Sequence, residues 1–203
     1  QGGNLPGLVT REQPIRTLGD LRGVRIRVPN ELISVMRDLG ADPVNMPMGE
    51  VYSALAKGII DGVVAPADTF DALHLGEVAR YYTQLEVPRG AYPARAIGGE
   101  RWEQLSNEHR AVLEESSAVW EAALADENRR ALDAGLSYAL EQGIIVNEIS
   151  AEDQSRFDAL YSREAERSAA QLARYGIDGR SVLASARASI DDTGSIRCRQ
   201  GSE

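Results

Sequence analysis

Residues 23–29 (Gly-Val-Arg-Ile-Arg-Val-Pro) constrain the fold more than any other stretch of this chain. Valine and isoleucine alternate with Arg25 and Arg27, which is the period-two pattern of a strand with one buried and one polar face. Because proline cannot continue a central strand, the strand ends at Pro29. Asn30 then stands where a side chain caps the start of a helix, so the stretch predicts a strand followed directly by a helix.

Arg27 lies close to the carboxyl end of this predicted strand. In open α/β sheets ligands bind at that end, and the free N–H groups at a helix start favour anions. A guanidinium placed there can clamp a carboxylate with two parallel hydrogen bonds. The alternative is a solvated arginine on the exposed face of an edge strand, and this stretch alone leaves both interpretations open.

The residues that follow alternate short helices with short strands. Apolar residues at helical spacing predict helices at 31–39 and 50–57, and short apolar runs predict strands at 43–46 and 63–64. Pro66 lies just beyond the second of these strands and suits the first turn of another helix. Alternation of this kind predicts an α/β fold with a parallel sheet and helical crossovers.

The second half of the chain is dominated by helices. Residues 108–142 contain no proline and a single glycine, Gly135, which predicts one helix on the order of 50 Å long at 1.5 Å per residue. A helix of that length exceeds the width of a small lobe, so we expect it to span more than one. Further strands are expected at 8–9, 82–85, 91–97 and 144–146, and further helices at 150–175 and 180–190.

The composition narrows the class of partner. A net charge of −9 and a pI of about 4.9 argue against binding to nucleic acid or to anionic membranes. An acidic protein that binds an anion needs a locally positive site, which draws attention to Arg27. Cys198 is the only cysteine, so neither an internal disulfide nor a zinc site built from cysteines is expected. No apolar run approaches the roughly 18 residues of a membrane span.

Catalytic machinery is not evident in the sequence. Asp68, Asp71 and His74 share one helix face, which is either a weak metal site or a solvated surface, and His109 has no histidine or cysteine close to it. There is no G-x-S-x-G elbow, phosphate loop or dinucleotide fingerprint. Tyr92 could line a pocket or simply pack. We therefore expect no catalytic residue, no metal and no cofactor.

Four segments, taken in order and at their spacing, carry a family resemblance. They are G-V-R-I-R-V-P at 23–29, L-G-A-D-P-V-N-M-P at 39–47, E-V-Y-S-A-L at 50–55 and G-I-I-D-G at 58–62. Each is weak alone, but together they resemble the DctP-type solute-binding proteins of tripartite ATP-independent periplasmic (TRAP) transporters. The resemblance covers roughly residues 10–190.

The resemblance implies a two-lobed, periplasmic-binding-protein-like fold that closes on an organic acid and delivers it to a TRAP membrane permease. Residues 1–90 would form the α/β ligand-binding core of lobe two, and residues 91–130 would pack with lobe one and start the spanning helix. Residues 131–203 would return to lobe two with the C-terminal helices. Most of lobe one would precede Gln1, and we expect a signal peptide in the full-length precursor and a periplasmic location.

In this family the arginine that precedes V-P binds the substrate carboxylate, and Arg27 matches that position. Backbone groups around Asn30 and Ala65 are expected to supply further donors. The ligand-binding residues that we expect are Arg27, Asn30, Ala65, Pro66, Phe70 and Tyr92.

The chain departs from some family members at the expected site. Ala65 stands where sialic-acid-type members carry asparagine, and Gly7 lies near the place of their second arginine, so sialic acid is not the expected ligand. Members with a Pro-Trp-Glu-like segment bind other acids, but Ala67 replaces the aromatic residue here and Phe70 is a candidate substitute. The substrate stays open among small monocarboxylates, 2-oxo acids and dicarboxylates.

Two other classes of function stay open on the sequence alone. One is a ligand-free interaction module built around the long helix. The other is a small α/β hydrolase or lyase that uses Asp61, Asp68 or His74, although no nucleophile–base pair can be recognised for it.

Overall fold

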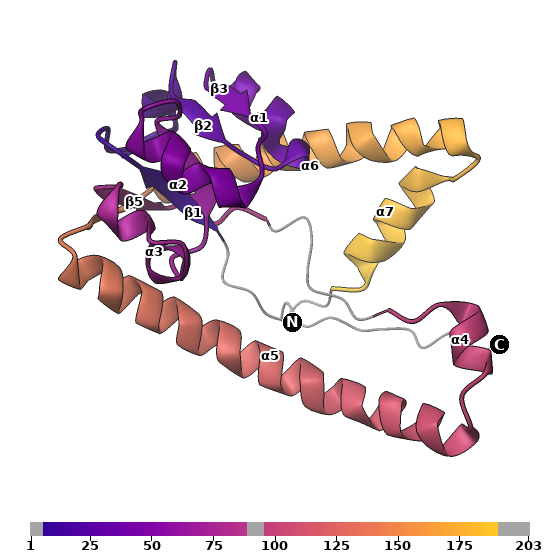
Figure 1. Cartoon of the computed structure of the whole chain (residues 1–203). Coiled ribbons are helices and arrows are strands. Elements are labelled where there is room, and N and C mark those ends of the chain that lie inside the picture. The colour runs from indigo at the N-terminus through magenta and orange to yellow at the C-terminus, as the bar shows by residue number, and fades with distance from the viewer. Residues whose placement is uncertain (1–5, 89–95, 191–203) are drawn as a thin grey trace. The chain divides into compact units, whose positions relative to one another are not determined.

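The computed structural model describes residues 6–88 and 96–190 (Figure 1). The chain divides into two compact units, Gln1–Gln154 and Ser155–Glu203. The first unit contains a mixed sheet of six strands in the order β3-β2-β4-β1-β5-β6. The strands are β1 (Gly7–Thr10), β2 (Arg25–Arg27), β3 (Asp42–Val44), β4 (Gly62–Ala65), β5 (Tyr81–Gln84) and β6 (Ile145–Glu148).

The predicted alternation of strands and helices is confirmed for β2, β3 and β4. β2 lies between β3 and β4 and is parallel to both. The prediction of a parallel sheet is wrong for β1, which runs antiparallel to both β4 and β5. A crossover helix forces two strands to be parallel, but β1 is joined to β2 by a loop with one 3-10 turn, so its direction is not constrained in that way.

The long helix is confirmed at nearly its predicted bounds. α5 covers Asn107–Glu141, and the Oγ of Ser106 caps its first turn by accepting from the N–H of His109. The predicted helix at 150–175 is α6 with a closing 3-10 turn, and the chain leaves it through Gly176 at φ 75°. The helices are α1 (Ile33–Asp38), α2 (Met48–Ala56), α3 (Thr69–Ala72), α4 (Gly99–Glu103), α5, α6 (Ala151–Gln171) and α7 (Gly179–Ala188). The 3-10 turns are η1 (Leu18–Leu21), η2 (Asn30–Leu32), η3 (Leu75–Glu77) and η4 (Leu172–Tyr175).

Two local predictions need correction or fall outside the described chain. The helix after Pro29 is preceded by the 3-10 turn η2, so Asn30 does not cap it, and α1 begins only at Ile33. Of the strand expected at 91–97, residues 91–95 lie outside the described residues, and residues 96–97 are not in a strand. Within 6–88 and 96–190, no helix combines the length and the apolarity needed to cross a membrane.

One face of the sheet forms a core with α2, α3 and the C-terminal part of α5 (Figure 1). The fully or almost fully buried side chains on this face are Val9, Val63, Ala65 and Tyr82 from the sheet, Val51 and Leu55 from α2, Phe70 from α3 and Ala139 from α5. Each large apolar side chain buried in this way stabilises the fold by about 1.5–3 kcal/mol. In α5 only Gly135 and Ala139 are buried, so this helix is held by its C-terminal part.

Gly135 sets how closely α5 approaches the sheet. A Cβ atom on this glycine would lie 2.5 Å from the carbonyl oxygen of Ala67 and 2.6 Å from the Cα of Asp68. Both contacts are to backbone in the turn after β4, which has no flexible side chain to move away. The helix therefore packs directly on the peptide chain that leaves the carboxyl end of β4.

We expect Gly135→Ala to destabilise the protein by about 1–3 kcal/mol, because the added methyl group would overpack this contact. Gly49→Ala is a matched control, since Gly49 also lies in a helix but has open space where a Cβ would be placed. Urea unfolding followed by circular dichroism measures both changes. Equal stability of Gly135→Ala and the parent would contradict the close packing of α5 on this turn.

Candidate ligand-binding site

The strand register brings several chain segments to one edge of the sheet. The carboxyl ends of parallel β2, β3 and β4 lie at this edge, and the pairing of Gly7 with Ala65 adds the amino end of β1. This is the edge at which ligands bind in open α/β sheets. Four of the expected site residues, Arg27, Asn30, Ala65 and Pro66, lie at or just beyond these strand ends.

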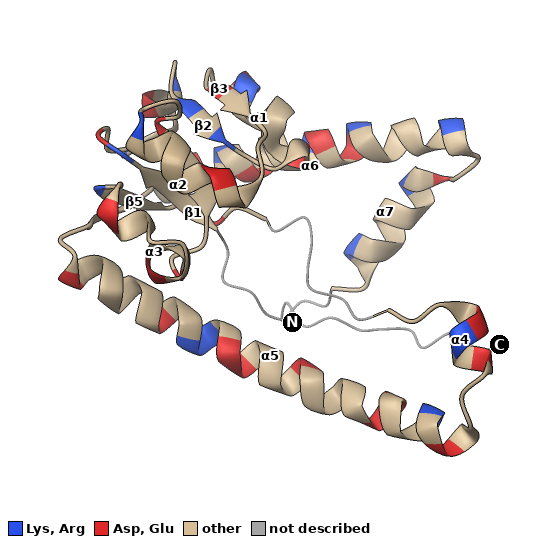
Figure 2. Ribbon diagram, in the orientation of Figure 1, with Lys and Arg blue, Asp and Glu red and all other residues tan. Residues whose placement is uncertain are grey.

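Arg27 is half-buried, and its guanidinium is not neutralised by an ion pair in the described part of the chain. Its Nε donates to the carbonyl oxygen of Met46 at 3.1 Å, which directs the side chain along the face that also carries Val63. Arg25, two residues earlier, is exposed and pairs with Asp42 through Nε and Oδ2 at 2.8 Å. Figure 2 shows these basic positions on β2. The two arginines of the strand therefore differ: Arg25 has an ion-pair partner, and Arg27 has none among the residues that the structure describes.

Partial burial lowers the pKa of Arg27, because removal from water disfavours the charged guanidinium, and nearby Glu31 opposes this by raising it. A guanidinium stays protonated in proteins, so this desolvation is a free-energy penalty on the charged side chain. A bound carboxylate would offset the penalty through charge-assisted hydrogen bonds. The electrostatics of Arg27 thus favour binding of an anion.

Asn30 is exposed at the start of η2, directly after β2. Its Oδ1 accepts from the Nδ2 of Asn45 at 2.9 Å, which leaves the Nδ2 group of Asn30 to act as a donor. The side chain therefore faces the loop after β3, on the same edge as Arg27. This position is compatible with the predicted contact to a bound acid.

Ala65 and Pro66 form the end of β4. Ala65 is buried opposite Gly7, so its contribution is limited to backbone groups and a methyl surface. The carbonyl of Pro66 accepts from the N–H of Thr69 at 3.1 Å and from its Oγ1 at 2.6 Å. Since proline has no N–H, Pro66 can offer a ligand mainly its half-buried ring.

Phe70 is placed in the core behind this edge. It is fully buried, and its ring meets Tyr82 edge-on with the ring centroids 5.5 Å apart and the planes at 82°. In this arrangement Phe70 has no exposed surface for a ligand and supports the site through packing. Tyr92 lies outside the described residues.

Two residues that the sequence analysis did not assign to the ligand site lie at the same edge. Asp68 follows β4, and its Oδ1 is buried without a hydrogen-bond partner within the described ranges. Tyr82 of β5 lines a pocket of about 630 Å³ together with Leu132 and Leu136 of α5 and Glu148 of β6. The sequence places Tyr82 in a predicted strand, as a tyrosine that could line a pocket or simply pack, and does not indicate where its hydroxyl points.

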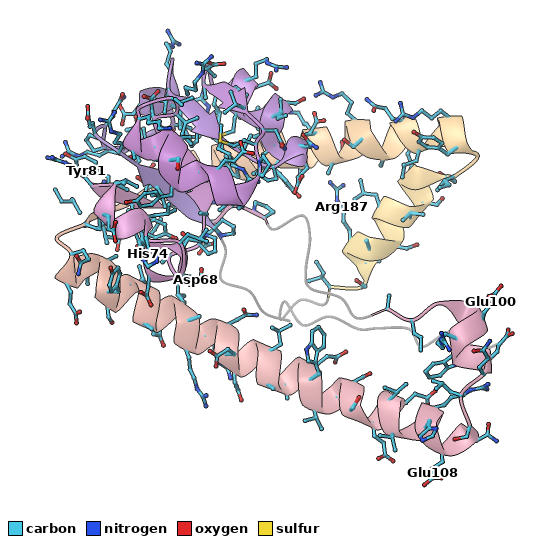
Figure 3. The ribbon with its side chains drawn as sticks, viewed as in Figure 1. Asp68, His74, Tyr81, Glu100, Glu108 and Arg187 are labelled. Carbon is cyan, nitrogen blue, oxygen red and sulfur yellow. The ribbon has the colours of Figure 1, made fainter. Side chains whose placement is uncertain are left out.

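The alternative chemistry of the acidic residues is not supported by their placement. Asp61 accepts from the N–H of Arg25 at 2.8 Å through Oδ2, so its carboxylate links the start of β4 to β2. The backbone of His74 is left-handed, at φ 54°. Its Nδ1 lies 3.9 Å from Oε1 of Glu77, at the exposed surface. Among the residues described, none form a group of three or more metal-ligating side chains. Figure 3 labels Asp68 and His74 on this part of the domain.

Solved structures with this fold define the class of protein. A TRAP solute-binding protein from a marine metagenome, specific for aromatic acid ligands and in complex with 3-hydroxybenzoate, has a TM-score of 0.75 and 26% sequence identity over 90% of this chain and 59% of its own. A TRAP solute-binding protein from Rhodoferax ferrireducens, in complex with copurified benzoate, has a TM-score of 0.75 and 25% identity, again over 90% of this chain and 59% of its own. The fold is that of the two-lobed TRAP solute-binding proteins.

The chain belongs to the family of bacterial extracellular solute-binding proteins, family 7 (DctP), whose profile matches residues 7–171. A solute-binding protein of Chromohalobacter salexigens is 28% identical over 171 residues, which are 78% of this chain and 47% of that protein. The chain thus spans about half the length of this curated relative. The family resemblance and the fold class expected from the sequence are both confirmed.

The buried phenol of Tyr82 predicts a pH dependence of stability. Burial raises its pKa to about 12, Asp68 adds to the rise, and a hydrogen bond from the N–H of Gly7 opposes it. Above the ordinary pKa of about 10, the unfolded chain ionises this group first. The stability that Tyr82 contributes is therefore complete below pH 10 and is lost as the pH rises toward 12, by about 1.4 kcal/mol per pH unit.

Urea unfolding at pH 9, 10 and 11 measures this loss. Tyr82→Phe removes the ionisable group, so its stability should fall less steeply above pH 10 than that of the parent. Tyr175→Phe, at an exposed position, keeps Tyr82 and should retain the steep fall. The same slope in Tyr82→Phe and the parent would show that the buried hydroxyl is not its source.

Proposed function

We propose that this chain is the carboxylate-holding part of an extracytoplasmic solute-binding protein that captures a small organic acid and is not an enzyme. The observation that carries the proposal is Arg27, a half-buried guanidinium without an ion pair in the described part of the chain, at the carboxyl edge of the sheet. Asn30, the backbone at Ala65 and the ring of Pro66 would complete the contacts from this lobe.

The energetics of the site support a carboxylate. A hydrogen bond to a charged group contributes about 1.5–3 kcal/mol, and a bidentate pair adds geometric specificity. The penalty already present on Arg27 makes an anion more favourable there than at an exposed arginine such as Arg25. The solved relatives hold benzoate and 3-hydroxybenzoate, which are both carboxylates.

The division into lobes and the delivery step are part of the same proposal. Residues 1–90 would supply the ligand-binding core of lobe two, 91–130 would pack with lobe one, and 131–203 would return to lobe two. Closure of the lobes would exclude water and strengthen the pair between Arg27 and the acid. The closed protein would pass its ligand to the membrane permease of a TRAP transporter in the periplasm.

Arg27→Ala should weaken the binding of small carboxylates by at least about tenfold, because it removes a charge-assisted hydrogen bond. Arg25→Ala is the matched control, since Arg25 lies on the same face of β2 but pairs with Asp42 at the surface. Isothermal titration of the full-length gene product against a panel of monocarboxylates, 2-oxo acids and dicarboxylates measures both variants. Arg25→Ala should bind within about threefold of the parent.

Three results would contradict the proposal. Equal weakening by both substitutions would mean that Arg27 acts through general charge. A parent protein that binds no acid in the panel would favour a ligand-free interaction module built around α5. Turnover of any panel member would favour the alternative that the protein is a hydrolase or lyase, in which Asp61, Asp68 or His74 would need a catalytic role.

A further inference from the structure

The loop between β3 and α2, residues 45–47, carries the hydrogen-bond acceptor that orients Arg27. The carbonyl oxygen of Met46 in this loop accepts from the Nε of Arg27 at 3.1 Å. Within 6–88 and 96–190 this is the one hydrogen bond that the Arg27 side chain makes. The position of the Met46 carbonyl therefore determines where the guanidinium lies at the carboxyl edge of the sheet.

Backbone hydrogen bonds end on either side of this carbonyl. The last bond between β2 and β3 runs from the N–H of Val28 to the carbonyl of Val44 at 2.9 Å. At the start of α2, the N–H of Glu50 donates to the carbonyl of Pro47 at 3.0 Å. Between these two bonds, residues 45–46 make no backbone–backbone hydrogen bond to any described residue. The place of the Met46 carbonyl must therefore be fixed by another group.

The side chain of Asn45 is the group that joins this loop to the chain after β2. Its Nδ2 donates to Oδ1 of Asn30 at 2.9 Å and, over a longer 3.5 Å, to the carbonyl oxygen of Val28. An amide nitrogen carries two N–H bonds, so both are used on residues 28–30, directly after Arg27. Asn45 thus ties the loop that holds the guanidinium to the segment that follows the same arginine.

The bond to Met46 also determines which edge of the Arg27 guanidinium is available. Arginine has one N–H on Nε and four on the two Nη atoms, and the Met46 carbonyl takes the one on Nε. In the described part of the chain, the Nη atoms have no hydrogen bond and no ion pair. Two parallel hydrogen bonds to a carboxylate would therefore use Nη1 and Nη2.

We propose that Asn45 is a positioning residue for carboxylate binding, which acts by fixing the Met46 carbonyl from which Arg27 presents Nη1 and Nη2. This inference rests on the proposed function of Arg27. A bidentate pair needs both N–H bonds to point at the two carboxylate oxygens, so its strength depends on the orientation of the guanidinium. An unanchored loop would allow several orientations, and ordering them on binding would lower the affinity.

Asn45→Ala should weaken the binding of a small carboxylate by roughly three- to tenfold, because Arg27 keeps its charge but loses the support of its orientation. Isothermal titration of the full-length gene product with benzoate, pyruvate and succinate measures this change, and the acid that the parent binds most tightly is used for all variants. Gln13→Ala is the matched control, because the Nε2 of Gln13 also donates to a backbone carbonyl, that of Asp20 at 3.1 Å, in the loop after β1. It should bind within about twofold of the parent.

A double-mutant cycle distinguishes positioning of Arg27 from a general structural role. In the Arg27→Ala protein, adding Asn45→Ala should change the dissociation constant by less than about twofold, because no guanidinium remains to be oriented. Asn45→Ser keeps one donor and should bind with an affinity between those of the parent and Asn45→Ala. Thermal unfolding of each variant without acid shows whether it is folded at the temperature of the titration, and Asn45→Ser replaces Asn45→Ala in the cycle if the alanine variant is not.

The outcomes separate this inference from the proposed function. Equal weakening by the Asn45 substitution in the parent and in Arg27→Ala would overturn the inference, because Asn45 would then act independently of the guanidinium. An unchanged affinity in Asn45→Ala would overturn it as well. Both results leave the proposed function intact as long as Arg27→Ala alone weakens binding. A parent that binds none of the acids would overturn both.

Discussion

The pairing of β2 with β4 is the interaction on which the candidate site depends. Asp61, just before β4, fixes it at two points, because its N–H donates to the carbonyl of Arg25 at 2.7 Å and its Oδ2 accepts from the N–H of Arg25 at 2.8 Å. A slip of one residue would turn every side chain of β2 to the other face. Arg27 would then lose its place on the face that carries Val63, so the position of the cation follows from a contact at the opposite end of the strand.

Close backbone contacts at two glycines shape the rest of the site. Gly7 lets the ring of Tyr82 lie across β1, and Gly135 lets α5 meet the turn that carries Asp68. The same two contacts join the long helix, the antiparallel strand β1 and the end of β4 into one support for the carboxyl edge. Backbone packing therefore positions the ring of Tyr82 and the turn that carries Asp68, whereas Arg27 and Asn30 are positioned by their hydrogen bonds to Met46 and Asn45.

Sequence patterns predicted the elements whose periodicity or length is distinctive. The alternation at 23–29 gave β2, and the stretch without proline from 108 gave α5, because both patterns arise from local geometry. The antiparallel direction of β1 and the edge-on packing of Phe70 against Tyr82 depend on contacts between segments that are separated in the chain. A single sequence carries no periodic signal for such contacts, so the pattern at 23–30 could place Arg27 and Asn30 near the end of a strand, while the positions of Asp68 and Tyr82 could not be predicted.

The charge balance of the molecule is consistent with selective binding at one point. A chain with net charge −9 repels anions at long range, and the exposed Arg25 is neutralised by its ion pair with Asp42. Long-range attraction of an acid is therefore weak, and affinity has to come from a short-range contact within a low-dielectric edge. A partly desolvated Arg27 meets that requirement. Because Arg27 would contact the carboxylate that all these acids share, discrimination among them must arise from protein groups that contact the rest of the acid.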